Sequence, residues 1–159
     1  TATVLSPAQK AFLAALPLSV TAEGCYFVHA SASSPQLFPY IHGLLEASDS
    51  FMATDARLTV CGHVHTPALY HISTTGKVMG FIPIAGAPIP MSSIRRWLAV
   101  MGAVGQPRDG NPAAAYGIID TARAEITYVR VPYDVEAAAA KISAAGLPDA
   151  LWKRLSVGR

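Results

Sequence analysis

The sequence predicts a mixed fold of the α+β or α/β class, with strands in the middle of the chain and helices towards both ends. Short apolar segments bounded by Gly, Pro or Ser recur between residues 18 and 131, and such segments are typical of strands. A capping pattern near the start and an alanine-rich stretch near the end predict helices. Apolar residues make up 52% of the 159 residues, enough to fill the core of one domain.

The first 39 residues predict a helix, two strands and a loop. Ser6 can cap the helix, Pro7 suits its first position, and Gln9 stands where a capping box needs a partner. The helix should end before Pro17. The expected segments are a helix over 6–16, strands over 18–22 and 25–28, and a Ser/Pro-rich loop over 30–39.

The rest of the chain predicts mainly strands, followed by two helices. Alternating apolar residues on either side of the turn at 74–76 predict a hairpin, and a second hairpin follows the Gly/Pro-rich loop. Asp134 opens the first C-terminal helix and Gly146 ends it. The expected segments are a helix over 40–47, strands over 57–61, 68–73, 77–82, 97–104, 115–120 and 125–131, and helices over 134–145 and after 148.

Composition excludes several classes of function. The formal net charge is +2, from 12 Lys+Arg and 10 Asp+Glu, and no basic block is interleaved with aromatic residues, so we expect no nucleic-acid partner. No apolar run approaches the ~18 residues of a membrane span, and the start of the chain lacks the features of a secretory signal. Cys25 and Cys61 lie in predicted strands, which indicates buried free thiols and a cytoplasmic protein.

The sharpest chemical feature is Gly62-His63-Val64-His65, which directly follows the strand over 57–61. Gly62 permits the chain to turn, so that both imidazoles can point into one site. Side chains two residues apart also share a face if the strand continues. Imidazole nitrogen is a good ligand for Zn, Fe, Mn and Ni, so the segment is a candidate metal site, with ordinary loop histidines as the alternative.

His29 repeats this arrangement, because it follows the apolar strand over 25–28 and precedes small residues. In sheets of this class, ligands bind at the carboxyl ends of the strands. Two strands that each end in histidine therefore predict one shared site. His42 and His71 have no motif around them and are expected to be exposed or simply hydrogen-bonded, although Tyr40 and His42 would suit a lid near the site.

Together the two histidine motifs resemble the last two sequence blocks of the calcineurin-like metallophosphoesterases. Val28-His29-Ala30-Ser31 looks like the fourth block and Gly62-His63-Val64-His65 like the fifth, in the family's order and at a compatible spacing. Other stretches are also similar to bacterial members, so the resemblance spans most of the chain. These stretches are Leu5-Ser6-Pro7, Gly105-Gln106-Pro107-Arg108-Asp109-Gly110, Ala114-Ala115-Tyr116 and Val131-Pro132-Tyr133-Asp134.

The family's first three blocks do not occur in the sequence: Asp-x-His, Gly-Asp-x-x-Asp and Gly-Asn-His-Asp/Glu. The resemblance therefore implies that residues 1–159 form the C-terminal half of a metallophosphoesterase domain. It implies that an N-terminal half, in the same protein or another chain, supplies the bridging aspartate, the asparagine ligand and the histidine that protonates the leaving group. No residue of this chain is assigned a certain catalytic role.

Carried over residue by residue, the resemblance makes His29 and His63 ligands of one metal ion, while His65 binds a second ion or faces the phosphate. It implies two divalent ions, of Mn, Fe, Zn, Ni or Mg, at one edge of a four-layer αββα sandwich with two facing mixed sheets. Two such ions clamp a phosphoryl group and activate a bridging water for in-line attack. The implied activity of the complete protein is hydrolysis of phosphomonoesters or phosphodiesters.

The Gly/Pro-bounded loop over 106–112 supplies weaker candidates. Arg108 can contact a phosphate bidentately, and Gln106 lies where the chain of a family member returns towards the metals. The alternative is that Arg108 pairs with Asp109 and only holds the loop together.

Two other functions stay open at this stage. His29, His63 and His65 would suit a mononuclear zinc hydrolase, with water as the fourth ligand. A degenerate, non-catalytic phosphoesterase module would instead bind a partner through uncovered apolar surface. Charged residues make up only 14% of the chain, against ~25% in typical soluble domains. We therefore expect association with the N-terminal half or with further copies of the chain, which would hide the strands over 25–28 and 57–61.

Overall fold

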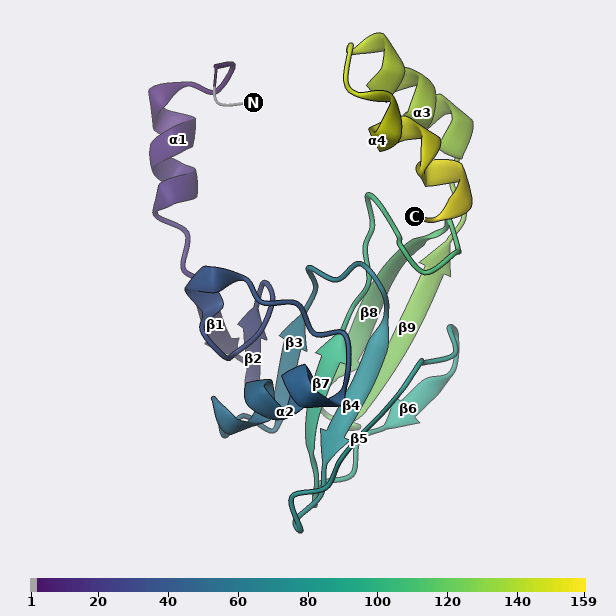
Figure 1. Ribbon diagram of the computed structural model, residues 1–159. Coiled ribbons are helices and arrows are strands. Elements are labelled where there is room, and N and C mark those ends of the chain that lie inside the picture. Colours follow the sequence, from purple (N-terminus) through teal and green to yellow (C-terminus); the bar gives the residue numbers. More distant parts are fainter. Residues whose placement is uncertain (1–2) are drawn as a thin grey trace.

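Two β-sheets lie face to face at the centre of the molecule, as the computed structural model shows for residues 3–159 (Figure 1). Sheet A has six strands in the order β1-β2-β3-β7-β4-β5, and sheet B has three in the order β6-β9-β8. The strands of sheet A are β1 (Ser19–Ala22), β2 (Cys25–Val28), β3 (Leu58–Cys61), β4 (Ala68–Ile72), β5 (Val78–Phe81) and β7 (Arg96–Val100). Those of sheet B are β6 (Pro88–Pro90), β8 (Ala114–Asp120) and β9 (Glu125–Val131).

Sheet A is mixed, because β2, β3 and β7 run parallel while β1, β4 and β5 are antiparallel to their neighbours. Sheet B is antiparallel throughout the part of the chain described. The prediction of an α+β or α/β fold with a mixed sheet is confirmed. The described residues thus build one large sheet and three strands of a second one.

The helices lie outside the sheets. They are α1 (Pro7–Ala14), α2 (Leu44–Met52), α3 (Val135–Ala144) and α4 (Asp149–Lys153), with 3-10 turns over Pro35–Leu37 and Leu155–Val157. The capping box of α1 is present, since the Ser6 amide donates to the Gln9 side chain at 2.8 Å and the Gln9 amide to the Ser6 hydroxyl at 3.2 Å. α1 has no buried residue and stands apart from the sheets in Figure 1, while α3 packs against α4.

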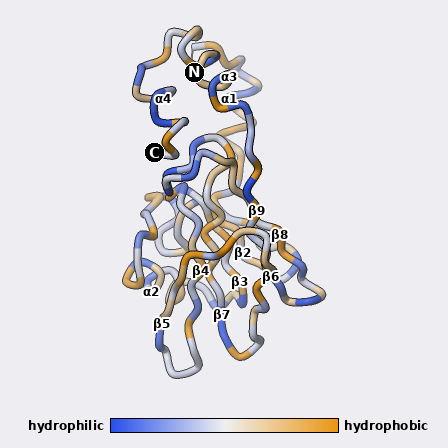
Figure 2. Tube along the Cα trace, turned by 90° about the vertical axis from the view of Figure 1, so that its right-hand side faces the viewer, coloured by the Kyte–Doolittle hydropathy of each residue, from blue (hydrophilic) through white to orange (hydrophobic). Residues whose placement is uncertain are grey.

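The two faces of sheet A bury different clusters. Alternation along each strand sends Tyr70 and Leu98 towards Phe51 of α2, and Leu69 and Trp97 towards sheet B. Figure 2 shows hydrophobic residues running through the strands, as this packing requires. Three layers follow, α2, sheet A and sheet B; among residues 3–159 no helix packs as a fourth layer against the outer face of sheet B.

Two polar contacts fasten these layers to one another. The buried Tyr128 hydroxyl of β9 donates to the Ala68 carbonyl of β4 at 2.9 Å, which links the sheets, and burial raises the pKa of this tyrosine. Arg96 of β7 donates to the carbonyls of Phe51 and Thr54 at 3.0 and 2.6 Å, which satisfies the C-terminal end of α2.

The helix expected over 40–47 is the main local error. α2 begins at Leu44 after Gly43, and the preceding residues are not helical. Ile41 is only 2% exposed and packs into the cluster beneath α2. This packing holds residues 40–43 in a non-helical conformation. Cys25 and Cys61 are buried free thiols, as predicted. None of the helices described has the length and apolar character needed to cross a bilayer.

Candidate metal site

His29 and His63 follow the ends of neighbouring parallel strands. The register Phe27↔Val60 between β2 and β3 means that the next residues of both strands leave sheet A at the same edge. The Gly62 amide donates to the His29 carbonyl at 3.0 Å, which ties the two strand ends together. His29 Nε2 and His63 Nδ1 lie 3.0 Å apart, so the structure brings these two predicted ligands into contact.

The turn that separates the two histidines of the fifth block is made by the histidines themselves. His63 and His65 have φ values of 64° and 66°, in the left-handed region that L-residues rarely adopt. The Val64 amide donates to the Gly62 carbonyl at 2.7 Å, closing a tight turn about His63. Gly62 is not among the residues with positive φ, so the left-handed conformation in this turn belongs to the histidines and not to the glycine.

The tautomer of His65 is fixed by a backbone carbonyl. Its Nδ1 lies 2.7 Å from the Gln106 oxygen. A carbonyl oxygen only accepts, so Nδ1 must carry the proton, and Nε2 keeps a free lone pair. A histidine held in this way by its other ring nitrogen is the common arrangement of a metal ligand. His65 is thus suited to bind a metal, and Gln106 supports it through its backbone carbonyl.

The surroundings of His63 favour the neutral imidazole. Burial lowers the pKa of this histidine, and the nearby His29, His65 and Arg108 lower it further, against a hydrogen bond to the backbone of Phe38 that raises it. A neutral imidazole is the form that binds metals.

The spacing of the paired nitrogens fits one metal ion. Two nitrogens bound at about 2.1 Å are about 3.0 Å apart when the bonds meet at 90°, and about 3.4 Å apart at a tetrahedral angle. The observed 3.0 Å between His29 and His63 suits two adjacent ligands. Within residues 3–159, however, no three His, Cys, Asp or Glu side chains gather closely enough to hold an ion. This chain alone supplies imidazole and no carboxylate.

An aromatic cluster lies beside the histidines and includes Tyr40 and His42, which the sequence offered only as parts of a lid near the site. Tyr40 stacks on His63 at 4.2 Å between ring centroids, with 28° between the planes, and on His42 at 5.2 Å and 10°. Phe38 meets the His29 ring edge-on at 5.5 Å. The signal in the sequence was the alternation Phe38-x-Tyr40-x-His42, which matches an extended segment better than the helix expected over 40–47.

The loop over 106–110 lies against His65. The Arg108 amide donates to the His65 carbonyl at 3.1 Å, and the Arg108 guanidinium donates to the Gln106 side-chain oxygen at 3.1 Å. The side chain of Asp109 pairs with Arg130 of β9 and not with Arg108. The alternative in which Arg108 and Asp109 hold each other is therefore wrong, and Arg108 is exposed beside the histidines.

His71 lies away from the site, in the middle of β4, and is only 7% exposed. Its Nε2 accepts from Arg95 at 3.2 Å, its ring meets Trp97 edge-on at 5.1 Å, and its buried Nδ1 has no partner among the residues described. His71 is thus a core residue with an unsatisfied donor. His42, by contrast, is exposed and belongs to the aromatic cluster.

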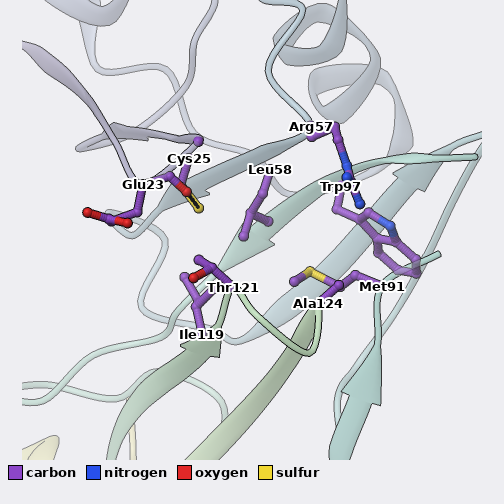
Figure 3. A pocket seen from close by; sticks show the side chains of 10 residues that line it. Glu23, Cys25, Arg57, Leu58, Met91, Trp97, Ile119, Thr121 and Ala124 are labelled. Atoms are coloured by element: carbon purple, nitrogen blue, oxygen red, sulfur yellow. Dashed lines mark hydrogen bonds between the residues drawn. The ribbon is translucent and has the colours of Figure 1, made fainter. Parts of the chain in front are cut away.

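Two hollows border the sheets. An apolar pocket of about 200 Å³ lies where Leu58, Ile119, Met91 and Trp97 converge (Figure 3). It lies at the start of β3, whereas His63 follows the end of that strand, so it is not part of the histidine site. A shallow trough instead runs to His29 along residues of the inner face of sheet A, namely Leu18, Val20, Phe27, Val60 and Met101.

Comparison with known proteins finds relatives that share this sequence and fold. The chain is 33% identical to a metallophosphoesterase from Sphaerobacter thermophilus of known structure and superposes with a TM-score of 0.89, over 100% of this chain and 64% of that one. It is also 33% identical to the uncharacterized protein MJ0912 of Methanocaldococcus jannaschii over 152 residues, 93% of this chain and 59% of the relative. The hypothetical protein PH1004 from Pyrococcus horikoshii shares the fold, with a TM-score of 0.66 at 15% identity over 96% of this chain and 55% of that one.

No family model matches the sequence. The chain spans about three-fifths of the length of the relatives it matches. Its likeness to the Sphaerobacter protein extends over the whole chain and confirms the resemblance inferred from the histidine blocks.

Proposed function

Because the chain has the fold of a metallophosphoesterase, we propose that it contributes histidine ligands to a metal-dependent phosphoesterase centre in the complete protein. The observation that carries this proposal is the meeting of His29 Nε2 and His63 Nδ1, 3.0 Å apart, at the ends of adjacent parallel strands. A convergence of this kind is what a ligand pair requires, and neither motif predicts it alone.

The separate partner of His65 favours two ions over one. His29 and His63 face each other, while His65 is held by Gln106 through Nδ1 and leaves Nε2 for another ligand. In the two-ion assignment His29 and His63 bind one ion and His65 binds the other. The mononuclear three-histidine alternative needs all three imidazoles in one group, and no such group occurs among residues 3–159.

The metal ions, of Mn, Fe, Zn, Ni or Mg, would supply Lewis acidity and a nucleophilic water in such a centre. The residues of this chain would hold and orient the histidine ligands and the substrate. Gly62 ties the two strand ends, Gln106 fixes the His65 tautomer, and Arg108 presents exposed guanidinium nitrogens beside the histidines. A phosphoester substrate would place its anionic oxygens against Arg108.

Carboxylate ligands must come from outside this chain in the proposed centre. We assign them to an N-terminal half of the same protein, with residues 1–159 as the C-terminal half of the domain. The apolar trough that ends at His29 supports this assignment, since it leaves Val20 and Phe27 at 47% and 37% exposed directly beside the proposed site. A segment packed there would bring its residues within reach of the histidines.

The test measures metal content and activity together in the native polypeptide that contains this chain. We expect two divalent ions per molecule and hydrolysis of an aryl phosphate. In His63→Ala we expect loss of bound metal and loss of this activity. One ion per chain with full activity would favour the mononuclear hydrolase instead. A metal-free and inactive protein that forms a defined oligomer would indicate the non-catalytic module.

A further inference from the structure

The ring of Tyr40 stacks on two imidazoles. Its centroid lies 4.2 Å from that of His63 and 5.2 Å from that of His42. The planes differ by 28° and 10°, so both contacts are stacked rather than edge-on. Tyr40 therefore packs against the ring of a predicted metal ligand, which limits how far the His63 imidazole can rotate.

The segment that carries Tyr40 is anchored at both ends. Ala32 is buried and its amide donates to the Ser50 hydroxyl of α2 at 3.3 Å. Ile41, 2% exposed, is locked in the cluster beneath α2. Between these anchors Ser34 and Phe38 adopt left-handed backbone, with φ values of 53° and 49°, unfavourable for residues other than glycine. The backbone between the two anchors is thus strained, and this strained conformation places Phe38 and Tyr40 beside the histidines.

We infer that Tyr40 is a positioning residue of the metal site: its stacking on His63, next to the stacked ring of His42, holds the His63 imidazole with Nδ1 facing His29. The inference rests on the proposed function, because it assigns Tyr40 to the same site. Tyr40 does not touch the ion. It acts through the ring of His63, as hydrogen-bonded partners act on other metal-ligating histidines.

The stacking face, and not the hydroxyl, carries this role. No hydrogen bond of the Tyr40 hydroxyl occurs in the part of the chain that the structure describes, so Tyr40→Phe keeps the full contact with both imidazoles. Tyr40→Leu keeps apolar bulk but removes the planar face. His42→Ala leaves the Tyr40–His63 contact in place and removes only its outer support.

The experiment titrates Mn²⁺ into the metal-free native polypeptide by calorimetry and follows thermal unfolding of the same metal-free samples. Tyr40→Leu should weaken Mn²⁺ binding about 10-fold, the lower end of the effect of losing a supporting partner. Tyr40→Phe should bind like the unmodified protein, and His42→Ala should lie between the two. Leu37→Ala is the matched control, because Leu37 lies in the same loop and is 74% exposed.

The possible results distinguish failure of the positioning role of Tyr40 from failure of the proposed metal site. If His63→Ala abolishes Mn²⁺ binding while Tyr40→Leu binds normally, the positioning role is wrong and the proposed function stands. If His63→Ala itself binds Mn²⁺ normally, the proposed site is wrong. Loss of affinity in Tyr40→Leu with an unchanged unfolding temperature supports positioning. Equal weakening in Tyr40→Phe would overturn the stacking argument, and Tyr40→Phe also decides the case if Tyr40→Leu fails to fold.

Discussion

At His63 and His65 the backbone adopts a conformation that costs of order 1–3 kcal/mol for each residue with a side chain. Glycine would relieve that cost at either position but would remove the imidazole. The surrounding structure opposes the strain with the Val64–Gly62 and Gly62–His29 hydrogen bonds. Such strained residues are typical of functional sites, and here they separate two ring nitrogens that a regular strand would direct to one face.

Metal content should distinguish the histidines of the site from the histidine of the core. His63→Ala should lower the affinity for a divalent ion by more than about 100-fold, because supporting residues alone are worth 10- to 100-fold. His71→Leu should retain the metal, since His71 lies buried on β4 against Trp97. Elemental analysis of both purified variants makes the comparison, and equal metal content in the two would contradict the assignment of His63.

The buried His71 should make the protein less stable in mild acid. Burial, and secondarily Arg95, lowers the pKa of this histidine below its unfolded value. The unfolded state then takes up the proton first, so the free energy of unfolding falls as pH drops below about 6.5 and stops falling below the folded pKa. In His71→Leu this part of the decline should vanish. Urea unfolding between pH 7.5 and 5 measures it, and parallel curves for the two proteins would contradict the prediction.

At the scale of elements, two glycines near the site should differ in how much stability the protein loses when each is replaced by alanine. A Cβ at Gly102, where φ is 81°, would lie 2.8 Å from the Pro67 ring and 2.9 Å from the Ala115 side chain. A Cβ at Gly62 would lie 3.9 Å from the nearest heavy atom. Gly102→Ala should therefore cost about 2 kcal/mol or more, and Gly62→Ala much less. Chemical denaturation of both variants provides the check; similar losses would mean that Gly62 is needed for the turn after all.

The elements themselves were largely predictable from local patterns. Ser6 and Gln9 cap α1 as their spacing indicated, and both hairpins, β4–β5 and β8–β9, lie where alternation placed them. The insertion of β7 between β3 and β4 was not predictable, because a parallel pairing of residues 39 apart in sequence leaves no local signal. Pro88–Pro90 lies in none of the predicted strands, yet it pairs with β9 as an edge strand, where proline is tolerated.

The candidate site was predictable only in part. Strand-end position indicated that His29 and His63 would meet, and they do. The roles of Gln106 and Tyr40 depend on how two loops fold back over the strand ends, which residue order does not encode locally. The tautomer of His65 likewise follows from a carbonyl 41 residues away.

For the whole molecule, the exposed apolar surface lies only in part where the sequence indicated. β3 was expected to be bare, but all four of its residues are buried between α2 and sheet B. The uncovered positions include Phe27 on β2, at 37% exposure, and Ile82 and Ile84 after β5, at 77% and 79%. We therefore expect association to use exposed surfaces of this kind rather than the centre of sheet A.

Light scattering should detect this association. Residues 1–159 alone should form oligomers, and a co-expressed N-terminal half should bind them and hide Phe27. Phe27→Ser should weaken that complex, while Ile82→Ser should leave it intact and reduce only self-association. A monomer that ignores the N-terminal half and binds no hydrophobic dye would mean that the chain is complete by itself.

The two cysteines allow local opening of sheet A to be followed by the rate at which their thiols are alkylated. Cys61 is one residue from Gly62, and burial raises its pKa to about 12, so its thiolate is scarce while β3 stays in place. Only thiolates react with alkylating reagents, and modification of Cys61 therefore has to wait for the strand to separate. Cys25 begins the neighbouring strand and borders the pocket at the other end of the sheet. The order in which the two sulfurs are alkylated would thus reveal which end of the β2–β3 pair opens first. An ion joining His29 to His63 would delay alkylation at the Cys61 end.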